Sequence, residues 1–461
     1  MKYENLKRHS KSFSEYTELR VQENTSALVF AVNGDFVGNQ KSTSAGLSAR
    51  AYKDGVWGFA STSEQNDTAI EDTIKRATEN ANFLASRAEQ KDKGLPEGFS
   101  GTGEHGKKDL SKYASQKEMI EFVSDIENYL KSKYPEINSR KIRMSTIDTE
   151  RTIITSDNCD CYSFVSSGNL MLSLGMNAED SPVQIYDTFG GLGQIKDLFH
   201  SPKDLYENID ILVEVLKKKA EGVYAKAGVH DVVLDSELAG ILSHEAIGHT
   251  VEADLVLGGS VASNFMNRQV ASPLVTLVDF AYEYNGKLCP VPIWIDDEGV
   301  AAKDAVIIKD GVLQTYMHNK ASAKHFGVEP TGNARANDFF DEPLIRMRNT
   351  AILPGTSKLE DMISGIEDGY YLIRPNNGQA DTTSEFMFGV VLGYEIKNGK
   401  LGKALRDCTV AGVAFDMLKT ITMISDDMTW SNSGWCGKKQ TIKVGMGGPA
   451  IKCKIGIGGR A

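Results

Sequence analysis

The chain has 461 residues, of which 41% are hydrophobic and 25% are charged, as is typical of a globular protein with two or three domains. This composition excludes a mainly disordered, collagen-like or coiled-coil chain. The 51 basic and 62 acidic residues give a formal net charge of -11, which disfavours a protein that coats nucleic acid or binds an anionic membrane, because both need a basic surface.

The first 20 residues are rich in Lys, Arg and Glu and lack the apolar stretch of a signal peptide. Purely apolar runs such as Ala27–Val32 are too short to cross a bilayer. We therefore expect a cytoplasmic protein that does not enter a membrane. Its six cysteines would be thiols in a reducing cytosol.

The N-terminal half is predicted to alternate strands and helices. Short β-branched and aromatic runs between turn residues predict hairpins within residues 26–59. Apolar residues three and four apart predict helices from Asp67 to about Arg87 and from Lys117 to Tyr134, and a further helix is expected from Pro202 to about Glu221. The segment between Glu89 and Ser111 has no periodicity and is predicted to be a loop. Further strands are expected near 142–145, 151–155, 161–165 and 170–174.

The polar and small residues from Lys219 to Gly228 are a candidate domain boundary. Beyond them the chain is rich in predicted strands and glycine-containing turns, beginning with Val232–Leu234. We predict an α+β protein with an N-terminal α/β-type domain of mixed sheet and helices, residues 1–225. A strand-rich C-terminal domain, residues 226–461, would carry the metal-binding helix described next.

The sharpest motif is His-Glu-x-x-x-His at His244–His249. Its histidines are five residues apart, which separates them by about 140° around an ideal α-helix. For both imidazoles to meet one ion, the helix must widen locally to i→i+5 bonding, a π-bulge, or end at the motif. Gly248 fits a backbone that is distorted just before the second histidine.

The chemistry of this motif suits amide hydrolysis. Neutral imidazoles bind zinc, which polarises a carbonyl and acidifies water, and Glu245 could accept the proton of that water. The alternative is that His244 and His249 are two buried histidines on different helix faces, each satisfied by hydrogen bonds.

A catalytic zinc site has three protein ligands and one open position, so another ligand is needed. Cys436 is one candidate, because the glycines beside it let the backbone approach closely and Lys438 could favour the thiolate; a buried thiol is the alternative. Glu252, three residues after His249, is a rival ligand or a supporting carboxylate. Cys289, Cys408 and Cys453 are interpreted as buried thiols. Cys159 and Cys161, a Cys-x-Cys pair, could bind metal but lie in the other half of the chain.

Further motifs follow one another along nearly the whole chain, and through them the sequence resembles the TldD/PmbA family of metalloproteases, in particular the TldD-type subunit that carries His-Glu-x-x-x-His. These motifs are 46–50, 55–59, 244–254, 296–299, 310–313 with Tyr316, 330–333, 346–350, 378–381 and 436–445.

The resemblance implies a cytoplasmic, zinc-dependent peptidase that acts on unfolded or extended polypeptides, as a homodimer or with a PmbA-type partner. It further implies that one Zn²⁺ per chain is bound by His244, His249 and Cys436, with Glu245 as the catalytic acid and base.

Substrate contacts are less well defined by the sequence. Hydrolysis needs a donor to the developing oxyanion, for which Tyr316, His318 and Arg346 are weak candidates, because a structural role is favoured for each. A peptidase for unfolded chains can hold its substrate as an added strand on a sheet edge, which we expect in the strand-rich C-terminal half.

Two other functions are compatible with the motif. A non-catalytic partner or peptide-binding subunit with a structural metal is one, but such a site has no need of the base Glu245. A zinc amidohydrolase that acts on a small molecule is the other, and it predicts a closed pocket in place of an open cleft. A nucleic-acid partner is not expected, because the chain is acidic and no reading motif is recognised.

Overall fold

A computed structural model of the chain describes residues 6–88 and 94–458. The described N-terminal residues form a long, curved, seven-stranded sheet in the order β3-β2-β1-β5-β6-β4, with β7 paired to β6. Only β4 runs parallel to its neighbour within these residues, so the sheet is mixed, as predicted. The strands are β1 (Tyr16–Val32), β2 (Asp35–Lys53), β3 (Val56–Thr62), β4 (Thr102–His105), β5 (Ser139–Thr155), β6 (Asp160–Met176) and β7 (Val183–Leu192).

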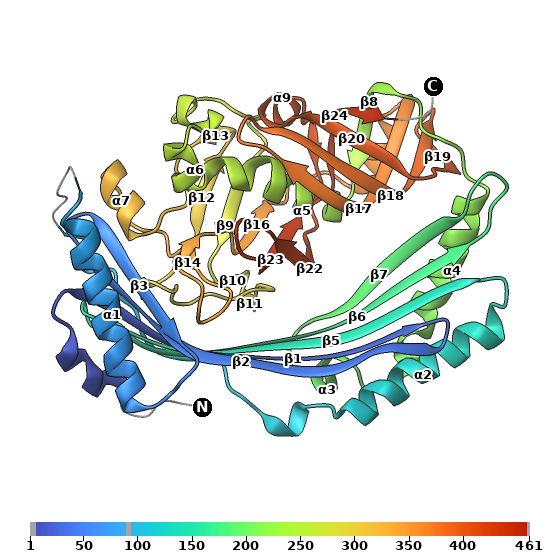
Figure 1. Cartoon of the computed structure of the whole chain (residues 1–461). Helices are drawn as coiled ribbons and strands as arrows, with labels where there is room; N and C mark the ends of the chain where they lie inside the picture. The colour runs from blue at the N-terminus through green and yellow to red at the C-terminus, as the bar shows by residue number, and fades with distance from the viewer. Residues whose placement is uncertain (1–5, 89–93, 459–461) are drawn as a thin grey trace.

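Figure 1 shows α1 and α2 on the outer, convex side of this sheet and the C-terminal half on its concave side. The side chain of Asn66 caps the first turn of α1, and Ser115 forms a capping box with Glu118 at the start of α2. The three predicted helices are confirmed, the third beginning as a 3-10 turn at Pro202–Leu205. The helices of this half are α1 (Asp67–Ala85), α2 (Gln116–Lys133), α3 (Ile195–Leu198) and α4 (Tyr206–Ala220).

The strands of this sheet are much longer than the sequence predicted. Residues 142–145 and 151–155 belong to one strand, β5, and residues 161–165 and 170–174 belong to β6. Polar residues interrupt the apolar pattern within both strands, but β5 pairs continuously with β6 across those interruptions. Backbone ladder bonds do not depend on the side chains, so periodicity underestimates a strand whose middle has a polar face.

The predicted loop between 89 and 111 is partly wrong. Residues 89–93 lie outside the described part of the chain, whereas Thr102–His105 form β4, parallel to the start of β6. A strand of four residues is too short to show periodicity, so only its pairing identifies it.

The described C-terminal residues form two larger sheets. One has seven strands in the order β17-β8-β24-β20-β18-β19, with β21 paired to β24, and the other has six in the order β13-β12-β9-β16-β23-β22. The first sheet contains β8 (Gly228–Leu234), β17 (Asp368–Ala380), β18 (Glu385–Lys397), β19 (Lys400–Ala404), β20 (Cys408–Val413), β21 (Met423–Ile424) and β24 (Ile451–Gly458). The second contains β9 (Leu277–Phe280), β12 (Ala305–Lys309), β13 (Val312–Leu313), β16 (Asn349–Ile352), β22 (Thr429–Cys436) and β23 (Ile442–Gly448).

Helix α5 (Ser236–Leu242) contacts β17 of the first sheet and β23 of the second, and its apolar residues join the largest buried core. The remaining short strands and α-helices are β10 (Glu283–Tyr284), β11 (Lys287–Leu288), β14 (Ala334–Arg335), β15 (Leu344–Ile345), α6 (Ala253–Leu257), α7 (Lys320–Phe326), α8 (Leu359–Ser364) and α9 (Ala414–Lys419), and 3-10 turns lie at Leu6–Ser12, Leu110–Lys112 and Val261–Asn264. The chain is therefore α+β, with a strand-rich C-terminal half, as predicted. Among the described residues, no helix combines the length and the apolar character needed to span a membrane.

Candidate metal centre and cleft

The His-Glu-x-x-x-His motif lies on a helix that changes its winding. The side chain of Asp235 caps α5 by accepting a hydrogen bond from the backbone of Leu238 at 2.8 Å. After Leu242 the helix continues as a π-helical turn, Ser243–Gly248, and then as a 3-10 turn, His249–Val251. Of the two predicted arrangements, a local widening to i→i+5 bonding or a helix end at the motif, the structure has the widening. It brings the ring centroids of the two motif histidines within 5.2 Å.

Gly248 is required by packing, which corrects the reason that the sequence suggested. Its φ of -52° and ψ of -49° are ordinary helical values, so any residue could adopt its backbone. A Cβ atom at this position, however, would lie 1.9 Å from the Sδ atom of buried Met347. The glycine therefore permits close contact between the π turn and Met347.

His244, His249 and Cys436 come together although Cys436 is 187 residues beyond His249. One ligand atom from each residue lies within 4.8 Å of the other two, and Cys436 Sγ is 3.4 Å from His249 Nε2. Within residues 6–88 and 94–458, this is the single group of three or more His, Cys, Asp or Glu side chains arranged so that they could hold a metal ion. Cys436 occupies the end of β22, an edge strand of its sheet.

His244 supplies a direct test of whether a metal fits this cluster. The side chain is fully buried, and neither ring nitrogen has a hydrogen-bond partner in the described structure. A buried imidazole without a partner is unfavourable unless another group, such as a metal ion, satisfies it. The alternative of two hydrogen-bonded core histidines therefore does not fit His244, whereas a metal ligand does.

The electrostatics of the cluster favour the thiolate form of Cys436. Burial raises the pKa of this thiol, but the adjacent imidazoles of His244 and His249 outweigh burial and lower it to about 3. Burial lowers the pKa of His249, yet its contacts with Cys436 and Glu252 raise it to about 10. The thiolate is the form of cysteine that binds metals.

Glu252 supports His249 from behind the ring. Its fully buried carboxylate lies 3.0 Å from His249 Nδ1, which orients the other ring nitrogen towards Cys436. Lys438, which the sequence placed near the thiol, instead directs its ammonium to Asp254 at 2.7 Å and to Glu252 at 3.4 Å. Glu252 thus lies beside the ligand cluster as a positioning group for an imidazole.

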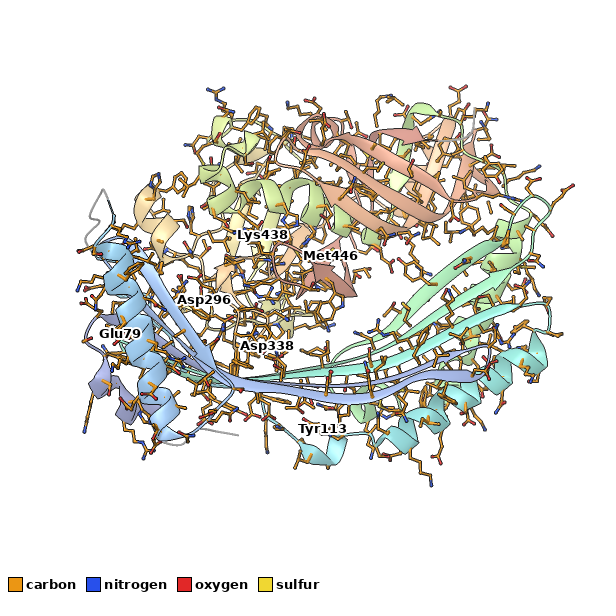
Figure 2. The ribbon with its side chains drawn as sticks, viewed as in Figure 1. Glu79, Tyr113, Asp296, Asp338, Lys438 and Met446 are labelled. Carbon is orange, nitrogen blue, oxygen red and sulfur yellow. The ribbon has the colours of Figure 1, made fainter. Side chains whose placement is uncertain are left out.

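Glu245 faces both the cluster and open space. Its carboxylate lies 3.7 Å from His249 Nε2, and its side chain is 16% exposed. It lines a cavity of about 400 Å³ together with Met446, which is labelled in Figure 2 on the side of the C-terminal half that faces the sheet. The carboxylate therefore adjoins the candidate metal position and a space that a substrate could enter.

A larger cavity of about 800 Å³ continues this space between the N-terminal sheet and the C-terminal half. The two cavities share four lining residues, Tyr186, Thr188, Asn377 and Trp435, so together they form one cleft. Strand β7, which carries Tyr186, contacts β22, which carries Trp435. The cleft is therefore bounded by both halves of the chain.

The three candidates for contact with the oxyanion are not among the residues that line the two cavities. Tyr316 donates its hydroxyl to the carbonyl of Ala262 at 3.1 Å, and His318 Nδ1 lies 3.1 Å from the Ser322 hydroxyl. Arg346 is fully buried and donates to three backbone carbonyls of the segment that carries the candidate ligand Cys436, those of Cys436, Lys438 and Gln440. Its position indicates support for that segment.

Several cleft residues carry little signal in the sequence. Trp435 precedes Cys436 without any pattern that marks it, and Lys443 stands as a charged residue inside an apolar strand, which is the signal available for it. Arg374 lies in the smaller cavity, 3.2 Å from Asp187 and 3.5 Å from Glu237. Nothing in the local sequence connects these side chains with one another.

Comparison with known proteins agrees with the motifs and with the fold. Residues 227–459 match the model of the PmbA/TldA metallopeptidase C-terminal domain, and residues 17–81 match PmbA/TldA metallopeptidase domain 1. A zinc metalloprotease TldD homolog from Saccharolobus solfataricus is 31% identical over 421 residues, 90% of each chain. A metalloprotease from Archaeoglobus fulgidus is 28% identical over 463 residues, 96% of this chain and 99% of the relative.

Among solved structures, TldE from Thermococcus kodakarensis has the same fold, with a TM-score of 0.80 and 18% identity over 98% of this chain and 99% of the other. At that identity the likeness concerns the fold alone. The family models, the TldD homolog and the ordered motifs together lead to one conclusion: the chain belongs to the PmbA/TldD family of metalloproteases.

Proposed function

We propose that this protein is a zinc-dependent peptidase of the TldD type that hydrolyses peptide bonds in unfolded or extended polypeptides. His244, His249 and Cys436 would bind one Zn²⁺ per chain, and Glu245 would act as general base. The observation that carries this proposal is the unpartnered, buried His244 beside a thiolate and a second imidazole, with Glu245 between this cluster and the cleft.

Two imidazoles and a thiolate suit zinc and leave a fourth position open, as in catalytic sites. A bound zinc ion would polarise the scissile carbonyl and lower the pKa of water. Glu245 would take the proton of the attacking water and deliver it to the leaving amine. Glu252 would keep the His249 ring in the orientation that ligation needs, because its carboxylate contacts the opposite ring nitrogen.

The cleft supports an extended chain as the substrate. Its two cavities of about 800 and 400 Å³ connect beside Trp435 and lie between the halves of the protein, unlike a closed small-molecule pocket. Strand β22 is an edge of its sheet and carries Cys436, so a peptide could add to it through main-chain hydrogen bonds. We place the predicted sheet-edge interaction there.

We further propose a cytoplasmic protein that works as a homodimer or with a PmbA-type subunit. The solved TldE structure shares its fold, which makes a related chain a reasonable partner. We also propose two domains, residues 1–225 and 226–461, because the boundary lies between the end of α4 at Ala220 and the start of β8 at Gly228.

The test is zinc content measured beside cleavage of an unstructured peptide. We expect wild type to bind about one zinc per chain, as in a mononuclear catalytic site. Glu245→Gln should keep the zinc and lose at least about 100-fold in cleavage rate, the usual effect of removing a general base. Cys436→Ala should lose zinc and cleavage together.

Cys453→Ala is the matched control, because this buried cysteine lies on β24 and is not part of the cluster. It should keep both zinc and cleavage. Cleavage that persists in Glu245→Gln, or wild type that binds no stoichiometric metal, would refute the proposed function.

A further inference from the structure

The larger cavity of the cleft carries an excess of positive charge. Its charged lining residues are Arg143, Asp407 and Lys443. The carboxylate of Asp407 is neutralised by Lys219, whose ammonium lies 2.6 Å away. Arg143 and Lys443 have no ion-pair or hydrogen-bond partner for their side chains among the described residues. Two unpaired cations therefore face one cavity in a chain whose net charge is -11.

Lys443 is held at the junction of the cleft. It lies on β23 opposite Trp435 of β22, and directly paired residues of neighbouring strands project to the same face of a sheet. Both side chains line the larger cavity and also a side pocket of about 80 Å³. Trp435 in addition lines the cavity that contains Glu245. The indole of Trp435 thus lies between Lys443 and the smaller cavity, which contains Glu245 and which we call the catalytic cavity.

Lys443 is half-buried. Burial lowers the pKa of this lysine to about 8, so it is still mostly charged at neutral pH but has lost part of its hydration. A charge in this condition is stabilised by a fixed anion, and residues 6–88 and 94–458 supply no such anion to Lys443. An anion from a ligand would fill that place.

The catalytic cavity has the opposite charge. It is lined by three carboxylates, those of Asp187, Glu237 and Glu245, and by one cation, Arg374, which is already paired with the first two. The cleft is therefore negative around Glu245 and positive around Lys443. A peptide that carries a negative group at one end would therefore bind more favourably with that end beside Lys443 than with it beside Glu245.

We propose that Lys443, with Arg143 as a second cation of the same cavity, binds a carboxylate of the peptide substrate and thereby orients the peptide in the cleft. This inference rests on the proposed peptidase function. The carboxylate belongs either to the peptide C-terminus or to an Asp or Glu side chain, because both present the same group to the ammonium.

The experiment measures peptide binding to zinc-loaded Glu245→Gln protein, which separates binding from cleavage. Three labelled, unstructured peptides are compared by fluorescence anisotropy: one with a free C-terminus and no acidic residue, one amidated and free of acidic residues, and one amidated with a single Glu. We expect at least one carboxylate peptide to bind about 10-fold more tightly than the carboxylate-free peptide, as for a charge-assisted contact. Whichever peptide gains affinity identifies the source of the carboxylate.

Lys443→Met should abolish this preference, Lys443→Gln should do the same if methionine disturbs the strand, and Lys443→Arg should keep most of it. Lys309→Met is the matched control, because Lys309 is an exposed strand lysine that does not line the cavities, and it should leave the preference unchanged. Circular dichroism checks that each variant is folded.

A preference that survives in folded Lys443→Met or Lys443→Gln overturns the proposal, and so does equal binding of all three peptides to the protein with Lys443 intact. These results differ from a failure of the peptidase function. If wild type cleaves peptides in a manner that needs Glu245 but ignores their carboxylates, only the carboxylate subsite is refuted.

Discussion

Individual buried side chains around the candidate metal site differ in whether protein groups satisfy their hydrogen-bonding atoms. His244 has no protein partner, whereas His249 is held by Glu252 and Cys436. The guanidinium of Arg346 donates hydrogen bonds to backbone carbonyls, including that of Cys436 at 2.7 Å. Described protein groups therefore hold the His249 ring and the backbone of Cys436, whereas a bound ion would supply the partner that His244 lacks.

His318 gives a pH-dependent prediction at the same scale. Burial lowers its pKa from 6.5 to about 4, so between these values the unfolded chain binds a proton that the folded protein does not. The contribution of His318 to the free energy of unfolding is complete above pH 6.5 and is lost as the pH falls towards 4, by about 3 kcal/mol at most.

We expect His318→Gln to flatten the fall in stability over that window, measured by urea denaturation of chelator-treated protein so that metal release does not contribute. The exposed His325 serves as the control, and His325→Gln should keep the wild-type slope. An unchanged slope in His318→Gln would show that other groups cause the acid sensitivity.

Among the elements, the π turn after α5 has the clearest structural cause. It places His244 and His249 together and depends on the absence of a side chain at Gly248. Gly248→Ala would put a Cβ atom 1.9 Å from Met347 Sδ, and Met347 is fully buried and cannot move into solvent. We expect a loss of about 1–3 kcal/mol in the free energy of unfolding, as for an overpacked core, together with weaker zinc retention.

A double-mutant cycle tests this cause. Met347→Ala removes the atom that the new methyl group would meet, so the double variant should be more stable than the sum of the single effects predicts. Gly437→Ala is the control, since a Cβ atom there would have no neighbour within 4 Å. Simple additivity of Gly248→Ala and Met347→Ala would mean that the contact with Met347 is not the reason for the glycine.

In the whole molecule, buried charges join the N-terminal sheet to the C-terminal half. Arg50 of β2 lies 2.9 Å from Glu18 of β1 and also pairs with Glu298, and all three side chains are buried. Arg20 donates to the backbone carbonyl of Asp338 at 2.9 Å, and Figure 2 shows Asp338 between the sheet and the C-terminal half. The cleft depends on these contacts, because its walls come from both halves.

Arg50→Met should therefore cost about 3–5 kcal/mol in the free energy of unfolding, because it leaves two buried carboxylates without their partner. Arg8→Met is a matched control, since Arg8 forms a 2.5 Å pair with Asp67 at the surface, where both side chains are more than half exposed. That control should change stability by less than about 1 kcal/mol. Equal effects in urea denaturation would show that the buried pair does not hold the halves together.

What the sequence determined by itself was mostly local. The apolar patterns located α1, α2 and α4, and the five-residue spacing of His244 and His249 predicted either a π turn or a helix end if both rings meet one ion, because such features depend on neighbours within two helical turns. The ordered motifs identified the family. Cys436 became a candidate ligand only through its glycine context and the resemblance, since its spacing from the histidines carries no geometric information.

The tertiary structure alone decided the cleft. The full lengths of β5 and β6 follow from pairing between strands, which does not require an apolar pattern. Burial of Arg346 against the cysteine segment joins residues 90 positions apart, and the placement of Lys443 in a cavity with Arg143 joins segments still more distant in the sequence. Side chains acquire such neighbours only when the chain folds. The sequence around a charged strand residue such as Lys443 therefore shows neither which cavity the side chain faces nor that it has no ion-pair partner among the described residues.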